Sequence, residues 1–127
     1  FTLARHPVTR FTTPLRQVPR ARADMAKADV LRLASRYRVP VVPVESPGNP
    51  GTLTGYLRVI ELGLSPAQTL APVHPLAEIP ADTTHLDALI RLQTARESLA
   101  RVVDAGGGTV GVVSIERLRE PLLPSRQ

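Results

Sequence analysis

The chain has 127 residues, of which 43% are hydrophobic and 3% aromatic, so valine, leucine, isoleucine and alanine must build the core of one domain or of two small repeats. The absence of cysteine excludes disulfides and thiolate metal sites and fits a reducing compartment. The sequence has no signal-peptide pattern and no apolar run near the roughly 20 residues of a membrane span. Because it opens with Phe1, we expect it to be a piece of a longer protein.

The net charge of +5 is concentrated at the N-terminus. Residues 1–38 hold nine basic and two acidic side chains, and the remainder holds seven basic and nine acidic ones. A basic third of this kind could meet nucleic acid, anionic lipid or an acidic neighbouring domain. Only Phe1, Phe11 and Tyr37 supply aromatic rings there, so a solvated face is favoured over nucleic-acid binding.

The N-terminal part predicts an arm followed by a strand and a helix. Residues 1–11 show no periodicity and are expected to form an arm or linker, and residues 17–21 are expected to form a short strand. Asp24 precedes a helical pattern with one buried stripe. That stripe comprises Val30, Leu33, Ala34 and Tyr37.

A hairpin is expected next. The β-rich run 39–44 contains Pro40 and Pro43, which withhold two backbone donors and predict an edge strand or irregular pairing. Residues 46–51 form a long turn, and the strand 53–59 returns. Glycine and proline residues in the connector 60–75 exclude a long helix there.

The second half repeats this order. Residues 76–80 start it, and Asp82, Thr83 or Thr84 is expected to cap a helix. The expected core stripe of that helix comprises Leu86, Leu89, Ile90 and Leu92.

A glycine-rich hairpin follows the second helix. The apolar runs 102–103 and 110–113 flank Asp104 and Gly106–Gly108, which suit a tight turn because glycine reaches positive φ without steric cost. Ser114, Glu116 and Arg117 follow the second strand. Hydroxyl and charged groups at a strand-to-helix junction can hold a ribose or phosphate. The alternative interpretation is that these three side chains bind no ligand and are only exposed to solvent after the hairpin.

The two halves correspond in sequence. Glu45 and Asp104 each follow a valine-containing strand, 59 positions apart, and Gly55 and Gly111 are 56 positions apart. This predicts three extra turn residues in the first half. Each half is too small to bury both faces of its sheet alone, so the halves are expected to complete a common core.

The stretch D-A-G-G-G-T-V-G-V-V-S-I-E-R over residues 104–117 resembles the second CBS motif of the hemolysin-like, CorC-type magnesium and cobalt efflux family. Arg117 stands where that family usually has Asp, and Ala105–Gly106 replace its acidic–aromatic pair. The segment Thr13–Leu15 resembles the start of the family's first motif, so the resemblance covers roughly residues 12–119.

The resemblance implies an α+β fold, a tandem CBS pair or Bateman module of two βαββα repeats related by pseudo-twofold symmetry. The expected division is an arm at 1–11, a first CBS motif at 12–64, a connector at 65–75, a second motif at 76–120 and a C-terminal tail at 121–127. CBS pairs commonly form homodimers, and the apolar exit helices would supply that contact.

The resemblance also implies an adenine nucleotide, AMP, ADP or ATP with or without Mg, bound in clefts and not as a tight cofactor. In the second repeat, Ser114 falls at the position that contacts phosphate and Arg117 at the position that contacts ribose. In the first repeat, these positions are Arg58 and Glu61, respectively. A guanidinium has donors only, so Arg117 cannot accept from ribose hydroxyls and would pair with phosphate instead. The expected nucleotide-binding set comprises Thr13, Arg58, Glu61, Pro80, Ser114, Glu116 and Arg117.

The expected function is that of a non-catalytic, nucleotide-sensing regulatory domain of a divalent-cation transporter, on the cytoplasmic face of the membrane. One alternative is a degenerate pair that serves only for dimerisation, and another is a basic nucleic-acid-binding module. His6, His74 and His85 are scattered without metal-ligand spacing and are expected at the surface, so no catalytic or metal site is predicted.

Overall fold

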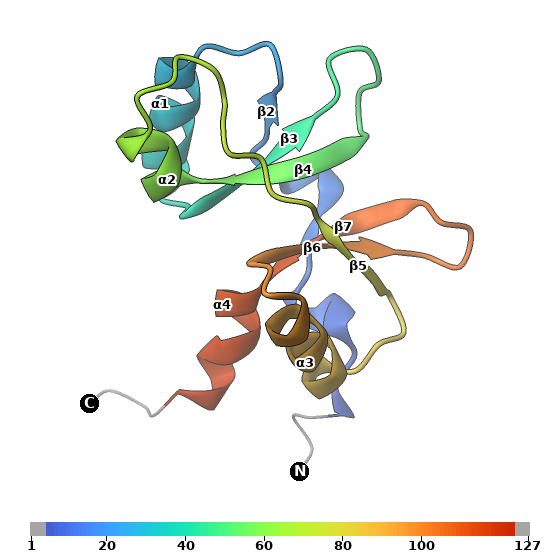
Figure 1. Cartoon of the computed structure of the whole chain (residues 1–127). Helices are drawn as coiled ribbons and strands as arrows, with labels where there is room; N and C mark the ends of the chain where they lie inside the picture. The colour runs from blue at the N-terminus through green and yellow to red at the C-terminus, as the bar shows by residue number, and fades with distance from the viewer. Residues whose placement is uncertain (1–4, 124–127) are drawn as a thin grey trace. The chain divides into compact units, whose positions relative to one another are not determined.

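The computed structural model describes residues 5–123. The chain forms two compact units (Figure 1), which we call the split unit, residues 5–18 with 77–123, and the 19–76 unit. The beginning of the expected arm, residues 1–4, and the end of the expected tail, residues 124–127, lie outside the described residues.

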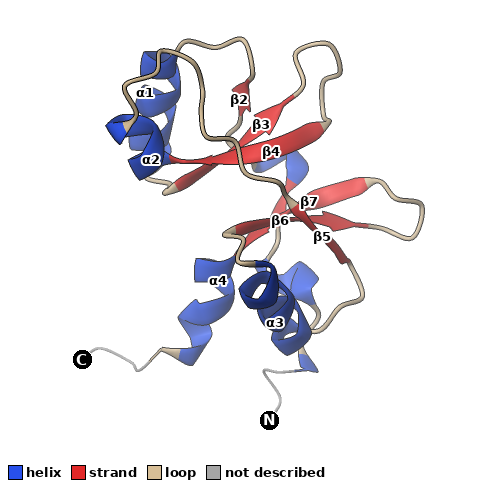
Figure 2. Cartoon of the chain, in the orientation of Figure 1, coloured by secondary structure: helices blue, strands red, loops and turns tan. Residues whose placement is uncertain are grey.

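The split unit consists of a four-stranded sheet with helices (Figure 2), and its strand order is β1-β7-β6-β5. Strand β5 runs parallel to β6, whereas β7 is antiparallel to both β6 and β1. Its elements in chain order are the 3₁₀ turn η2 (Val8–Phe11), β1 (Thr13–Pro14), the 3₁₀ turn η3 (Leu15–Gln17), β5 (Ala77–Pro80), α3 (His85–Ala95), β6 (Leu99–Val103), β7 (Thr109–Ser114), α4 (Ile115–Arg119) and the 3₁₀ turn η4 (Glu120–Leu122).

The 19–76 unit has a three-stranded sheet in the order β2-β3-β4, with β2 parallel to β3 and β4 antiparallel to β3. Its elements in chain order are β2 (Ala21–Arg22), α1 (Lys27–Tyr37), β3 (Val41–Glu45), β4 (Leu53–Arg58) and α2 (Val59–Leu64). The expected strand over 17–21 is therefore wrong: Gln17 ends a 3₁₀ turn, and the strand comprises only Ala21 and Arg22.

The one proline of β3, Pro43, is accommodated in a way that the sequence did not indicate. Pro43 lies in the central strand of the sheet, not at its edge. The strand β2 pairs only with Val44 and Glu45, so the third strand does not reach the position where Pro43 lacks a donor. The expected irregularity is present as a register shift between Val44 and Glu45.

The two units repeat the same order of helix, strand, hairpin, strand and exit helix, as expected. The true offset between them is 58, because α1 and α3 begin at Lys27 and His85 and end at the left-handed residues Arg38 and Arg96. The offset of 59 inferred from Glu45 and Asp104 is wrong by one residue. The first hairpin loop has two extra residues, not three, since 46–52 corresponds to 104–108.

The glycine-rich hairpin is confirmed, and its turn is closed by one carboxylate. Asp104 Oδ1 accepts from the amides of Gly106 at 3.0 Å and Gly108 at 2.9 Å. Gly107 has φ of +84°, a conformation that side chains disfavour.

The longer loop of the 19–76 unit is closed by Glu45. Its Oε2 accepts from the amide of Gly51 at 3.0 Å and from Arg20 Nη1 at 2.9 Å. The Gly51 amide first, and then the Arg20 guanidinium, hold the pKa of Glu45 below its ordinary value of 4.5.

Two residues of the expected arm, Val8 and Phe11, pack in the split unit. Val8 is fully buried, its amide donates to Thr83 O at 2.8 Å, and Phe11 packs against the same core. His85 is only 1% exposed and its Nε2 lies 2.7 Å from Leu118 O, so the expectation of a surface histidine is wrong there.

The buried faces of the helices differ in part from the predicted stripes. In α3, Leu89 and Leu92 are buried as expected, but Leu86 is 43% and Ile90 49% exposed. Their places in the core are taken by residues one or two positions away, Ala88 and His85. In α1, Val30 and Ala34 are buried and Leu33 is half-buried, whereas Tyr37 is 51% exposed.

Each unit has a short segment that lies against the last of its strands in chain order. In the split unit this is β1, with Thr13 opposite Val112, and in the 19–76 unit His74 forms an isolated antiparallel bridge with Tyr56. We call these two segments lead-in segments: residues 11–14 and residues 73–75. Among residues 5–123, no helix is both long and apolar enough to cross a membrane.

Candidate functional site

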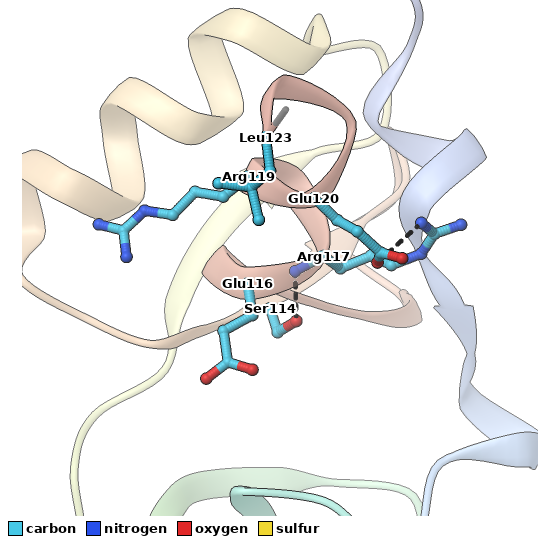
Figure 3. Close-up of a pocket in the computed structure, with 6 residues that line it drawn as sticks. All are labelled: Ser114, Glu116, Arg117, Arg119, Glu120 and Leu123. Atoms are coloured by element: carbon cyan, nitrogen blue, oxygen red, sulfur yellow. Dashed lines mark hydrogen bonds and ion pairs between the residues drawn. The ribbon is translucent and has the colours of Figure 1, made fainter. Parts of the chain in front are cut away.

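The junction between β7 and α4 places a hydroxyl and several charges around one pocket. Ser114 ends β7 and caps α4, because its Oγ accepts from the amide of Arg117 at 3.1 Å. The pocket has a volume of about 530 Å³ (Figure 3). It is lined by Ser114, Glu116, Arg117, Arg119, Glu120 and Leu123.

Arg117 is held from two sides while its side chain stays 50% exposed. Its guanidinium carbon lies 5.5 Å from the centre of the Phe11 ring, and its Nη1 lies 3.4 Å from Glu120 Oε2. A cation over an aromatic face is attracted by the ring quadrupole. A guanidinium has five N–H groups and Phe11 offers no hydrogen-bond acceptor, so Arg117 retains N–H groups that can donate to an anion.

Glu116, the residue before Arg117 in the sequence, supplies a carboxylate to the pocket. It lies in the first turn of α4, is exposed, and lines the same pocket (Figure 3). Ionised carboxylates accept hydrogen bonds, so Glu116 offers the acceptor that Arg117 cannot provide.

The two other expected residues of the split unit are not brought together. Thr13 is exposed on β1, opposite Val112 and close in register to Ser114. Pro80 is exposed at the end of β5, opposite Val103. Since β1 and β5 are the two edges of the four-stranded sheet, Thr13 and Pro80 lie on opposite sides of it.

The 19–76 unit holds the other two expected residues, and here they pair with each other. Arg58 Nη1 lies 3.9 Å from Glu61 Oε2, and Arg58 Nη2 donates to Tyr56 Oη at 3.1 Å. Glu61 Oε1 also lies 2.5 Å from His74 Nε2. This polar cluster of Tyr56, Arg58, Glu61 and His74 is what the structure places at the exit of β4.

Sequence reasoning missed the residues that surround the expected ones. The sequence places Phe11 in an arm and Leu123 in a tail, yet the Phe11 ring lies beside Arg117 and Leu123 lines its pocket. The sequence analysis treats His74 only as a surface histidine. No local pattern indicates its contact with Glu61, which lies 13 positions earlier in the chain. Among residues 5–123, no group of three or more His, Cys, Asp or Glu side chains could hold a metal ion.

The repeated order of elements, with a parallel strand pair and an antiparallel hairpin in each unit, defines the chain as a CBS-domain pair. Its resemblance to the CBS pairs of the hemolysin-like, CorC-type family is confirmed by solved structures. One is the CBS domain of a bacterial CNNM/CorC-family Mg²⁺ transporter in complex with ATP, at 26% identity and TM-score 0.81, covering 93% of this chain and 87% of that one.

Two further structures have the same fold at lower identity. A hemolysin-like CBS protein of Oenococcus oeni has 18% identity and TM-score 0.84, covering 98% of this chain and 95% of that one. The CBS domain of a putative transporter from Clostridium difficile has 22% identity and TM-score 0.83, covering 96% and 97%. No family model and no curated protein matches the sequence.

Proposed function

We propose that this chain is a non-catalytic regulatory domain that senses an adenine nucleotide, attached to a divalent-cation transporter at the cytoplasmic face of the membrane. The observation that carries the proposal is the pocket at the β7–α4 junction, which combines a hydroxyl, an exposed guanidinium and an exposed carboxylate. The similarity to the ATP-bound CBS domain of a CNNM/CorC-family transporter supports it.

The residues of this pocket match the parts of a nucleotide. The guanidinium edge of Arg117 suits phosphate oxygens, which planar forks bind in a bidentate manner. Ser114 Oγ can contribute a donor to the same phosphate, and Glu116 can accept from ribose hydroxyls. AMP, ADP and ATP, with or without Mg, present all of these groups. A ligand that binds one arrangement of the domain better than another would shift the attached membrane domain.

Calorimetric titration with ATP, ADP and AMP, with and without magnesium, tests the proposal. Replacing Arg117 by Gln removes a charged donor and is expected to weaken binding by about tenfold, equivalent to about 1.4 kcal/mol. The matched control is Arg91→Gln, an exposed arginine of α3 that does not line the pocket. No heat and no thermal shift at millimolar nucleotide would contradict the proposal.

We further propose that the domain forms a homodimer through its exit helices. In α2, Ile60 is 73% and Leu64 80% exposed, and they lie four positions apart on one helix face. Leu122 and Leu123 are also exposed after α4. Exposed apolar side chains that lie on one face of a helix mark interaction surfaces.

Light scattering coupled to size-exclusion chromatography tests the dimer. The double substitution Ile60→Glu and Leu64→Glu is expected to yield monomer, and the control Val110→Glu, on the hairpin, is expected to leave the mass unchanged. If the wild-type chain is a monomer at high concentration, the dimer proposal fails.

A second candidate function, a degenerate pair that only dimerises, is favoured by Arg117 at the family's acidic position. The titration above separates the two, since a purely structural pair binds no nucleotide. The nucleic-acid alternative loses support within the 19–76 unit, because three of its arginines pair with carboxylates. These pairs are Arg20–Glu45, Arg22–Asp24 and Arg32–Asp29.

A further inference from the structure

In both units the lead-in segment contacts the side chain at the expected ribose position, which is Glu61 in the 19–76 unit and Arg117 in the split unit. The contacting residue can hydrogen-bond to that side chain in the first case but not in the second. In the 19–76 unit His74 contacts Glu61, and in the split unit Phe11 contacts Arg117. We propose that His74 occupies the ribose acceptor Glu61, so that the 19–76 unit is closed by its own connector and the split unit alone takes nucleotide. This inference rests on the proposed function and assigns that function to one of the two units.

Two backbone hydrogen bonds and a ring contact hold the connector against β4 together with the side-chain contact to Glu61. The amide of Tyr56 donates to His74 O at 2.9 Å, and the amide of His74 donates to Tyr56 O at 2.8 Å. The two rings also lie 5.3 Å apart at an interplanar angle of 30°. The connector is thus attached to β4 directly before the turn that carries Glu61.

Gly55 permits this close approach. A Cβ at Gly55 would lie 2.7 Å from His74 O and 2.7 Å from a methyl carbon of Val73. Real Cβ atoms do not approach a carbonyl oxygen so closely, so glycine is required where the connector crosses the strand.

Both oxygens of the Glu61 carboxylate have a partner from the protein. Oε1 lies 2.5 Å from His74 Nε2, and Oε2 lies 3.9 Å from Arg58 Nη1. The side chains of Glu61, Arg58 and His74 are 35%, 30% and 21% exposed, so solvent only partly competes for these contacts. Ribose hydroxyls must therefore compete with His74 for Oε1 and with Arg58 for Oε2.

The split unit differs at each equivalent position. Thr13 stands opposite Val112, as His74 stands opposite Tyr56, and its short side chain is exposed. The contact with Arg117 comes instead from Phe11, whose ring has no hydrogen-bond donor or acceptor and lies 5.5 Å from the guanidinium carbon. Glu120 contacts Nη1 at 3.4 Å, but Phe11 itself accepts none of the five N–H groups, so this lead-in segment contacts the ligand-binding group without using its donors.

The test compares His74→Ala and His74→Gln with wild type and with His6→Ala, a histidine substitution in the split unit. Titration with ATP, ADP and AMP measures stoichiometry, and amide hydrogen exchange at residues 56 and 74 measures attachment of the connector. We expect about one nucleotide per wild-type chain and about two for His74→Ala, with exchange faster by about tenfold or more. The His74→Gln side chain can still donate to Glu61 and is expected to retain one site.

The results separate the two proposals. If the alanine variant keeps a stoichiometry of one, or if its amides exchange as slowly as in wild type, the closure by His74 is overturned. If neither wild type nor any variant binds nucleotide, the proposed function is overturned, and this assignment of it with it. Loss of binding in His74→Ala, with wild-type binding intact, would place the ligand on the 19–76 unit and also overturn the inference.

Discussion

Replacing Gly111 by alanine should detach the lead-in segment of the split unit from its sheet. A Cβ at this position would lie 2.0 Å from Thr13 O and 2.9 Å from both Thr13 C and a methyl carbon of Thr12. Ordinary contacts between such atoms are about 3.5 Å or longer. The neighbour is backbone, which cannot rotate away as a side chain does, so β1 must move by more than 1 Å, on the order of the shortfall.

Two estimates of the cost agree. Forcing an extra carbon into a packed site costs about 1–3 kcal/mol. If residues 8–14 detach instead, the fully buried Val8 becomes exposed, which costs about 1.5–3 kcal/mol. We therefore expect Gly111→Ala to lower the stability of the split unit by about 2–3 kcal/mol, or its Tm by on the order of 10 °C.

Two measurements test this. Thermal unfolding gives the loss of stability, and amide hydrogen exchange at Val8, whose amide donates to Thr83 O, reports detachment of the segment. The matched control is Gly63→Ala. A Cβ at Gly63, in α2, has no atom within 4 Å, so the substitution should stabilise the helix by about 0.5–1 kcal/mol. Equal stability of Gly111→Ala and wild type, with unchanged exchange at Val8, would refute the close packing of the lead-in segment.

Three further outcomes follow from the structure. Because its folded-state pKa is lowered, Glu45 should stabilise the protein above about pH 4.5 and lose this effect as pH falls through the folded-state pKa. The urea midpoint of Glu45→Gln should therefore vary less with pH below about 4.5 than that of wild type. The same pH dependence in both proteins would contradict this. Leu92→Ala should lower the free energy of unfolding, measured in urea, by about 2–5 kcal/mol, because the Leu92 side chain is fully buried. Leu86→Ala should lower it by about 0.5 kcal/mol or less, because Leu86 is 43% exposed. Similar losses in both variants would show that α3 buries a different face. Thr84→Ala should lower stability by about 1 kcal/mol because its Oγ1 caps α3, whereas Thr94→Ala, at an exposed position inside that helix, should not lower it in the same melting experiment.

The order of elements in each repeat could be predicted because the signals are local. Glycine triplets, valine-rich runs and a capping threonine act over a few residues, and the structure has a hairpin and a helix where they indicated them. The CBS-pair fold followed from that order and from the resemblance. The offset failed because Glu45 and Asp104 both close a loop with a carboxylate, although one ends a strand and the other begins a turn.

Features that depend on tertiary contacts were out of reach. Helical spacing alone cannot show whether the stripe through Leu86 and Ile90 or the one through His85 and Ala88 faces the sheet. A buried histidine bonded to a carbonyl 33 positions away has no local signature. For the candidate site, the sequence located Ser114 and Arg117, but Phe11 reaches Arg117 only because its segment folds onto a distant strand.

The discontinuity of the split unit makes the chain unusually sensitive at its beginning. Deleting the first 18 residues would leave every element of the 19–76 unit in place and would remove a strand and a fully buried valine from the C-terminal half. Removing these N-terminal residues would therefore disturb the structure near the other end of the chain, around Ser114 and Arg117.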